Sequence, residues 1–132
     1  MADRIFRFPK SVRLHLRKEI SDLFNSGNTI NAFPVRAKYK ICAGPGIPLQ
    51  MAVSVPKKHV KLAVNRNRIK RQIREIFRLK SHPTREYFAG KGKRAQIMFI
   101  YANRESLDYA VLESKIILIL QRLQEKNELG AV

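Results

Sequence analysis

The residues with the clearest chemical potential are the arginines and lysines of residues 63–80, AVNRNRIKRQIREIFRLK. Seven side chains of this run are basic, and Glu75 is its only acid. Like charges one helical turn apart destabilise a helix by about a few tenths of a kcal/mol per pair, so the run is unfavourable unless something anionic lies against it. It therefore predicts a binding surface for nucleic acid, for a membrane or for an acidic protein.

Catalysis would be another use of charged side chains, and the sequence argues against it. A protein that cleaves phosphodiesters with metal ions needs carboxylates that converge on ions about 3.5–4 Å apart. The acids of this chain are scattered, and His15, His59 and His82 have no paired Cys or acid motif. We therefore predict no catalytic residue and no metal ion bound by the protein alone. The histidines are expected at the surface or in contact with nucleic acid.

The composition predicts a folded and strongly basic protein. Its 132 residues are 45% hydrophobic, which suffices for one domain with a buried core. Lys and Arg number 27 against 10 Asp and Glu, and the formal net charge of +17 predicts a polyanionic partner. Residues 57–80 hold ten bases and one acid, whereas residues 105–132 hold three bases and five acids. The positive charge is therefore expected to form one surface.

The cysteine content and the hydropathy bear on the compartment. Cys42 is the only cysteine, so no intramolecular disulfide can form, and a reducing cytoplasm is the fitting compartment. The apolar and basic residues around Cys42 predict that it is a small buried residue. The longest aliphatic run, residues 116–120, is far shorter than the roughly 20 residues of a membrane span. Residues 1–10 lack the apolar stretch of a secretion signal. We expect a soluble cytoplasmic protein without membrane contact.

Hydrophobic periodicity predicts the elements that position these charges. Residues 1–13 show no sustained period and are expected to form a basic arm, before a domain over residues 14–125 and a short tail over residues 126–132. Helices are predicted over residues 17–25, with Gly27 as the stop, over residues 63–80, and from Ser106 onward. Strands are predicted over residues 32–42 and 49–56, joined as a hairpin, and over residues 95–102, an apolar interior strand. The order α-β-β-α-β-α indicates an α+β domain.

The helix expected over residues 63–80 has two chemically different faces. At 100° per residue, about a third of its circumference is apolar and the adjoining side is basic. The apolar residues are Leu62, Ile69, Ile73, Ile76 and Phe77. The basic residues are Arg66, Lys70, Arg71, Arg74 and Arg78. The apolar face is expected to anchor the helix, and the basic face is expected to meet the partner.

The segment over residues 56–78, PKKHVKLAVNRNRIKRQIREIFR, resembles the signature of the protein subunit of bacterial ribonuclease P. That signature is a Lys-Lys pair, a short spacer, Arg-Asn-Arg, Ile-Lys-Arg and then Arg-Glu. The matching positions here are Lys57, Lys58, Arg66, Asn67, Arg68, Ile69, Lys70, Arg71, Arg74 and Glu75. The family also has a helix that ends in Leu-Phe with Gly three residues later, as in Leu23, Phe24 and Gly27. The resemblance covers most of the chain.

The resemblance implies partners and a division of labour. Proteins of this family join a large catalytic RNA, and the complex removes the 5′ leader of precursor tRNA. The RNA subunit, with magnesium held mainly by the RNA and the substrate, performs the hydrolysis. Catalytic RNA and precursor tRNA are therefore the expected partners, with no obligate protein partner. The family fold is a small mixed sheet with helices packed on it and a left-handed crossover, against the usual right-handed preference.

The same resemblance implies that the basic helix lies near the core of the RNA subunit and that the helix and the Lys-Lys pair bind RNA. Which of these residues contact the leader and which contact the RNA subunit stays open at the level of the sequence. Arginine offers forked hydrogen bonds to phosphate and lysine offers a compact charge, so both suit closely spaced phosphates. The expected RNA-binding residues are Lys57, Lys58, Arg66, Asn67, Arg68, Lys70, Arg71 and Arg74. The alternative for the helix is a solvated charged face, and the alternative for Asn67 is a hydrogen bond to the backbone.

A groove between the first helix and the open sheet face is implied for the single-stranded leader. Its expected residues are Phe24, Arg36, Lys38 and Lys40. An aromatic ring can stack on an unpaired base while cations follow the backbone, which tolerates varied sequences. Core packing is the alternative for Phe24, and helical spacing alone favours it. The family often has an aromatic residue where this chain has Ile20.

Two other classes of function fit the composition. One is a ribosomal protein and the other is a DNA-binding protein with a basic helix. Both would account for the net charge, but neither predicts the ordered Arg-Asn-Arg helix after two strands. The sequence therefore favours the ribonuclease P protein over a nucleic-acid-binding protein without a role in cleavage.

Overall fold

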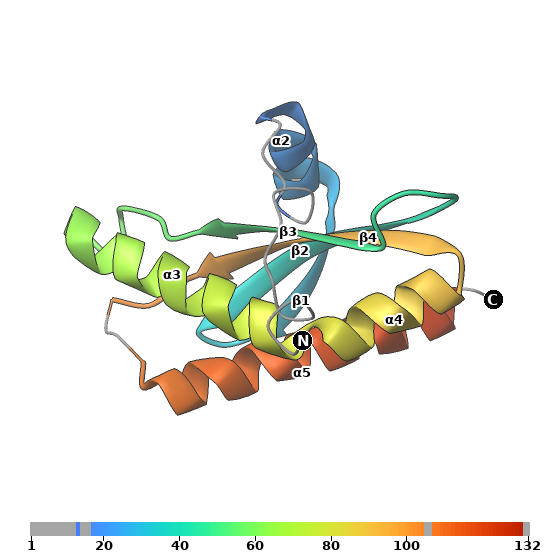
Figure 1. Cartoon of the computed structure of the whole chain (residues 1–132). Helices are drawn as coiled ribbons and strands as arrows, with labels where there is room; N and C mark the ends of the chain where they lie inside the picture. Colours follow the sequence, from blue (N-terminus) through green and yellow to red (C-terminus); the bar gives the residue numbers. More distant parts are fainter. Residues whose placement is uncertain (1–12, 14–16, 105–106, 131–132) are drawn as a thin grey trace.

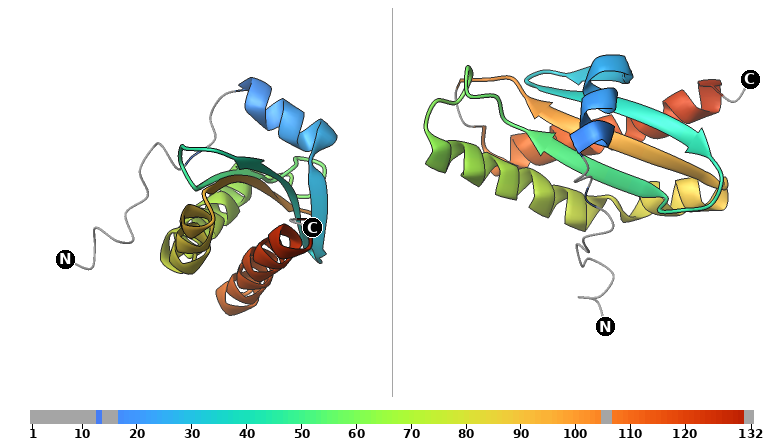
Figure 2. Two further views of the ribbon diagram at one scale, coloured as in Figure 1. Left: turned by 90° about the vertical axis from the view of Figure 1, so that its right-hand side faces the viewer. Right: turned by 90° about the horizontal axis from the view of Figure 1, so that it is seen from above.

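The computed structural model describes residue 13 and residues 17–104 and 107–130. A four-stranded sheet separates two layers of helices (Figure 1). Helices α3, α4 and α5 cover one face, and α2 lies alone across the other (Figure 2). The two faces therefore differ: one is closed by three helices, and the other is open on both sides of α2.

The elements follow the predicted order with two additions. They are α2 (Arg17–Ser26), β1 (Asn28–Ala32), β2 (Val35–Ala43), β3 (Leu49–Ser54), α3 (Ala63–Lys80), α4 (His82–Gly90), β4 (Lys93–Tyr101) and α5 (Tyr109–Gly130). The predicted helices and strands of the α+β domain are confirmed. Strand β1 and helix α4 were not predicted, because β1 is short and polar and α4 has a weak apolar period. Ser106 and most of the basic arm lie outside the described residues.

The predicted hairpin between the strands at residues 32–42 and 49–56 is wrong. The sheet order is β1-β2-β4-β3, so β4 separates β2 from β3. Strand β4 is antiparallel to β2 and parallel to β3, and the chain from β3 to β4 crosses over through α3 and α4. The physical reason is the composition of β4, whose residues 97–101 are all buried. A strand that is apolar on both faces is most stable in the interior of a sheet.

The main core lies between the sheet and helices α3, α4 and α5. The apolar face of α3 is confirmed there for Ile69, Ile73, Ile76 and Phe77, which are buried. The prediction is wrong for Leu62, which is 63% exposed because it precedes the helix as its N-cap residue. The rings of Phe77 and Phe99 meet edge to face, with 6.0 Å between their centroids. Each fully buried side chain of this size contributes about 1.5–3 kcal/mol. This burial holds α3 against the sheet and leaves its opposite side to solvent.

A smaller core fixes α2 to the open face. It consists of Leu23, Ala52, Met98 and Ile100, with Ile20 packed against it. The helix ends as predicted at Gly27, whose amide donates to the carbonyl oxygen of Leu23 at 3.0 Å. A Cβ atom at Gly27 would collide with that carbonyl oxygen, so only glycine allows this close turn into β1.

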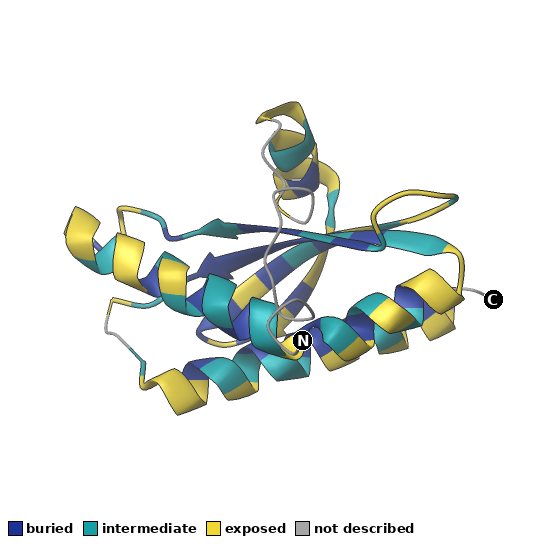
Figure 3. Cartoon of the chain, viewed as in Figure 1, coloured by how far each residue is buried: buried dark blue, intermediate teal, exposed yellow. Residues whose placement is uncertain are grey.

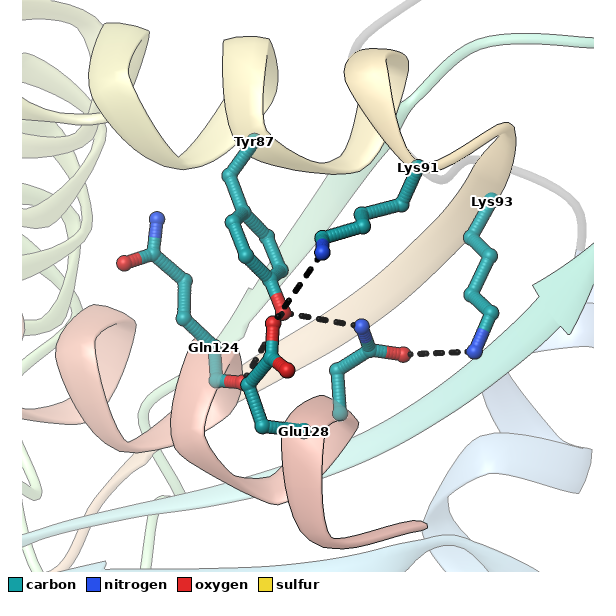
Figure 4. Close-up of polar contacts among 6 residues, drawn as sticks. Tyr87, Lys91, Lys93, Gln124 and Glu128 are labelled. Carbon is teal, nitrogen blue, oxygen red and sulfur yellow. Dashed lines mark hydrogen bonds and ion pairs between the residues drawn. The ribbon is translucent and has the colours of Figure 1, made fainter. Parts of the chain in front are cut away.

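A polar cluster fastens the end of α5 to α4 and β4 (Figure 4). The buried Asn127 donates to the Tyr87 hydroxyl at 3.0 Å and accepts from Lys93 Nζ at 3.1 Å. The Tyr87 hydroxyl also donates to Glu128, which pairs with Lys91 at 3.5 Å. The hydrogen bond from Tyr87, followed by the charge of Lys91, lowers the pKa of Glu128. Helix α5 thus continues through residues 126–130, which the sequence set apart as a tail.

Two sequence expectations about single features have different outcomes. Cys42 is exposed, so the prediction of a buried cysteine is wrong. Strand alternation explains this, since Cys42 shares the open face with Lys38 and Lys40, while Ala37 and Tyr39 face the core. Among the described residues, no helix combines the length and the apolar composition of a membrane span.

Candidate nucleic-acid interface

The open face of the sheet presents three cations in a row along β2. Arg36, Lys38 and Lys40 alternate with the buried residues of that strand, so all three lie on the side of α2. Across the sheet, Arg36 is level with Ile100 of β4, and Lys38 is level with Met98. The central strand thus supplies an apolar floor, and β2 supplies positive charge along one edge of that floor.

A groove of about 830 Å³ lies on this floor. Its lining residues come from α2, the β1–β2 turn, the open sheet face and the loop after β3. They are Phe24, Asn31, Phe33, Pro34, Val35, Arg36, Lys38, Ser54, Pro56, Lys58, His59, Ile100 and Ala102. Among the described residues, no acidic side chain lines the groove, so the described lining favours an anionic or neutral occupant. Of the predicted leader-binding residues, Phe24, Arg36 and Lys38 line the groove, whereas Lys40 lies beyond its lining on the same face.

Phe24 is exposed in the groove and does not belong to the core. Its exposed fraction is 53%, against 1% for the neighbouring Leu23, so the core-packing alternative is wrong. Leu23 and Ile20 point toward the sheet, and the next position on the helix turns Phe24 by 100° toward the groove. The ring is therefore accessible to a ligand while its helix is held by other side chains.

A second hollow, of about 550 Å³, lies on the β3 side of α2. Phe24 and Ser54 line both hollows, so the two meet under the end of α2. Ile20 lines this second hollow with Ala52 and Met98. An aliphatic side chain thus occupies the place where the family often has an aromatic ring.

The loop between β3 and α3 joins the groove to the basic helix. Lys57 and Lys58 are exposed there, and Lys58 and His59 line the groove. Arg66 braces this loop, since its Nη1 donates to the carbonyl oxygens of Val60 at 3.0 Å and Lys61 at 2.6 Å. The structure therefore gives Arg66 a structural role besides its predicted contact with RNA.

The outer side of α3 carries the remaining predicted residues. Asn67, Arg68 and Arg71 are exposed, and Lys70 and Arg74 are partly exposed beside the buried stripe (Figure 3). The helix begins without a side-chain cap and without an acid in its first turn. The positive end of its dipole is therefore not offset locally and adds to the field of the side chains.

The single acid of the run does not neutralise this surface. Glu75 pairs with Arg78 through two hydrogen bonds, of 2.6 Å to Nη2 and 3.2 Å to Nε. The hydrogen bond from Arg78 lowers the pKa of Glu75, so the carboxylate stays ionised and committed to that arginine. Arg78 is therefore a poor candidate for contact with a phosphate, in contrast to Arg71.

The start of the described chain adds a further cation beside α3. Arg13 forms an isolated parallel bridge with Met51, at the edge of β3. Burial, followed by the charge of Arg13, lowers the pKa of Arg74. The two arginines are thus close enough to interact, and the positive surface extends from α3 toward residue 13. Sequence reasoning placed Arg13 in the basic arm without connecting it to this helix.

Phe33 was not predicted as a groove residue, and His59, which was expected at the surface or in contact with nucleic acid, was not assigned to the groove. Phe33 was assigned to the strand at residues 32–42, but it lies in a turn between β1 and β2. The signal that could have found it is the Phe-Pro pair, because proline is disfavoured inside a paired strand.

Among the described residues, no three His, Cys, Asp or Glu side chains gather where a metal ion could bind.

The fold defines an α+β protein with cations along the open face of the sheet and on the outer side of α3, an arrangement suited to nucleic acid. The sequence model of the family described as Ribonuclease P matches residues 8–124. The chain therefore belongs to the ribonuclease P protein family. That membership makes it a protein component of an endoribonuclease, the ribonuclease P ribonucleoprotein of tRNA processing, and a partner of the ribonuclease P RNA. The resemblance stated from the sequence is confirmed.

Individual relatives agree with this assignment. The ribonuclease P protein component of Porphyromonas gingivalis is 35% identical over 109 residues, covering 82% of this chain and 80% of the relative. The RNase P protein from Thermotoga maritima superposes with a TM-score of 0.62 at 24% identity, covering 83% of this chain and 96% of that one. The Staphylococcus aureus RNase P protein gives a TM-score of 0.63 at 19% identity, covering 86% and 96%. At these identities the two structures support the fold alone.

Proposed function

We propose that this protein binds the catalytic RNA of ribonuclease P through α3 and the 5′ leader of precursor tRNA through the groove beside α2. The observation that carries the proposal is the exposed ring of Phe24 in a groove whose described lining includes Arg36 and Lys38 and no acid. Stacking on an aromatic ring with cations along the backbone is how proteins bind single strands without sequence preference. Leaders of different sequence require this tolerance.

The basic helix is proposed to contact the RNA subunit. Its exposed side carries Asn67, Arg68 and Arg71, with Lys70 and Arg74 along the border of the buried stripe. Lys57 and Lys58, in the loop that connects helix and groove, lie between the two proposed contacts. This loop thus connects the proposed leader contact with the proposed contact to the RNA that cuts beside it.

Hydrolysis is proposed to be the work of the RNA subunit, with magnesium held mainly by the RNA and the substrate. Metal-assisted phosphodiester hydrolysis needs carboxylates or other anionic oxygens around the ion. The described part of the protein offers no cluster of such side chains, so its residues do not fit a metal site. The contribution proposed for this chain is binding and positioning.

Reconstitution tests the proposed function. The purified protein, added to a bacterial ribonuclease P RNA, should restore cleavage of precursor tRNA at a low magnesium concentration at which the RNA alone is inactive. The protein without RNA should not cleave with any divalent metal. Cleavage by RNA-free protein, retained through stringent purification, would overturn the assignment of chemistry to the RNA. Failure to stimulate the RNA would overturn the proposed binding roles.

A further inference from the structure

Phe33 is the most exposed large hydrophobic side chain among the described residues, with an exposed fraction of 76%. Exposed apolar residues are common, and exposure alone does not indicate a function. Phe33 differs because it lines the same groove as Phe24, together with Arg36 and Lys38. Leu129 is exposed to a similar extent, 71%, but it borders a separate hollow near Arg122.

The backbone around Phe33 is fixed on both sides. Ala32 pairs with Val35, which closes a two-residue turn of Phe33 and Pro34 between β1 and β2. The buried Pro34 accepts a hydrogen bond from the Ala102 amide at 2.9 Å, which ties the turn to the chain just after β4. The ring of Phe33 therefore projects from an anchored turn, and the ring itself packs little against the rest of the protein. The backbone that presents the ring is already ordered, so stacking of a planar ligand carries no cost for ordering the turn itself.

The charges of the groove indicate what kind of molecule the ring meets. Arg36 follows Phe33 by three residues on β2, and Lys58 reaches the groove from the loop after β3. Exposed aromatic rings among cations, with no acid among the described lining residues, match the alternation of flat bases and phosphates in a single strand of RNA. A purely apolar peptide would leave these cations without partners.

We propose that Phe33 is a second stacking platform, on which one unpaired base of the leader rests while another base stacks on Phe24. The groove thus holds at least two nucleotides between the end of α2 and the β1–β2 turn, with Arg36 and Lys38 placed for the backbone phosphates. This inference rests on the proposed function of the groove, and it adds a contact residue at the side away from α2.

The test uses the holoenzyme assembled with a bacterial ribonuclease P RNA. Affinities for precursor tRNA and for mature tRNA are measured with the wild type and with Phe33→Ala, Phe33→Leu and Phe33→Tyr. Phe33→Ala should lose about five- to tenfold in affinity for precursor tRNA, the lower part of the range for one lost base stack. Phe33→Leu should lose a similar factor because it keeps apolar volume without a ring face, and Phe33→Tyr should restore binding. Affinity for mature tRNA should not change.

Leu129→Ala is the matched control, because it also removes an exposed apolar side chain. It should leave both affinities unchanged. The chain has no tryptophan, so Phe33→Trp creates a single tryptophan, in the groove, whose emission can be excited selectively over that of the four tyrosines. Its emission should change on addition of precursor tRNA and stay constant with mature tRNA.

The outcomes separate this inference from the proposed function. If the wild-type holoenzyme does not prefer precursor over mature tRNA, the proposed leader groove itself is wrong. If the wild type shows that preference and Phe33→Ala retains it, only the role of Phe33 is overturned. An equal loss for both tRNAs, or an equal loss in Phe33→Tyr, would also reject stacking on this ring. Binding of an acidic peptide in place of the leader, lost in Phe33→Ala, would assign the ring to a protein partner.

Discussion

Two arginines of α3 with the same charge and different surroundings allow a sharp test of the basic helix. Arg71 is exposed, whereas Arg78 is held by both oxygens of Glu75. Arg71→Ala and Arg78→Ala each remove one positive charge from the same helix, so they weaken the long-range field about equally. Only Arg71 is placed to make a direct contact with phosphate. The difference between the two variants therefore isolates the contact from the overall charge.

The expected magnitude follows from the chemistry of the lost contact. A hydrogen bond between a charged donor and a phosphate contributes about 1.5–3 kcal/mol, so Arg71→Ala should weaken assembly with the catalytic RNA by roughly one to two orders of magnitude. For about five phosphate contacts, the slope of log affinity against log salt should be on the order of −3.5 to −4.5. Arg71→Ala should make that slope less negative by about 1. Arg78→Ala should change affinity by less than about 1 kcal/mol.

The assay is a titration of the protein with catalytic RNA at several salt concentrations, beside thermal melting of the free protein. Both variants should melt near the wild type. Exposed substitutions such as Arg71→Ala usually change stability by less than about 0.5 kcal/mol, and the partly exposed pair of Arg78 with Glu75 contributes about as little. Equal losses of affinity in Arg71→Ala and Arg78→Ala would mean that only the overall charge matters. Unchanged assembly in Arg71→Ala, and in Arg68→Ala combined with Lys70→Ala, would refute the placement of the RNA subunit on this helix.

Three further predictions concern the groove, the polar cluster and pH. Phe24→Ala should reduce the preference for precursor over mature tRNA by about 1–3 kcal/mol with little change in melting temperature; a joint loss of melting temperature and assembly would instead indicate packing. Asn127→Ala should lower the free energy of unfolding by about 1–3 kcal/mol in urea denaturation, because the Tyr87 hydroxyl loses a partner in a partly buried site, and an unchanged value would contradict this. The pKa of Glu75 is lowered by Arg78, so their pair should stabilise the protein above the unfolded pKa of Glu75 and lose this effect as pH falls through the folded pKa. Because the pair is partly exposed, we expect it to contribute only about 0.3–0.5 kcal/mol. The measurement is the difference in the free energy of unfolding between wild type and Glu75→Gln at several pH values. This difference should be larger at neutral pH than at acid pH, and the opposite order would contradict the prediction.

Local patterns in the sequence were sufficient for the elements with strong periodicity. The apolar stripe of Ile73, Ile76 and Phe77 predicted both the helix and the face it buries, because burial repeats with the helical period. The apolar run of β4 likewise predicted an interior strand. The ordered basic motif predicted the family, since it depends on residue types at fixed spacings and on no long-range contact.

Strand order and pairing depended on the tertiary structure. The apolar run of β4 favours an interior position, but the choice of β2 and β3 as its neighbours depends on where α3 and α4 carry the chain, and no local pattern specifies those neighbours. The sequence therefore predicted a hairpin where the protein places a crossover. Strand β1 was missed for a related reason. Its polar residues have a weak intrinsic preference for a strand, and the strand forms because it pairs with β2.

The candidate site divides in the same way. Residue types alone indicated cations and an aromatic ring for RNA, but helical spacing favoured a buried Phe24, and only the packing of Leu23 and Ile20 under α2 decides that its ring is exposed. Arg66 is a second example. The motif indicates a contact with RNA, and only the tertiary structure shows that its side chain also donates to two backbone carbonyl oxygens of the loop before α3. Charge and periodicity are properties of a segment and can be read from the chain. The exposure of a side chain, the pairing of strands and the presence of Phe24 and Phe33 in one groove arise only when distant segments pack together. Each depends on which parts of the chain become neighbours and bury one another's side chains.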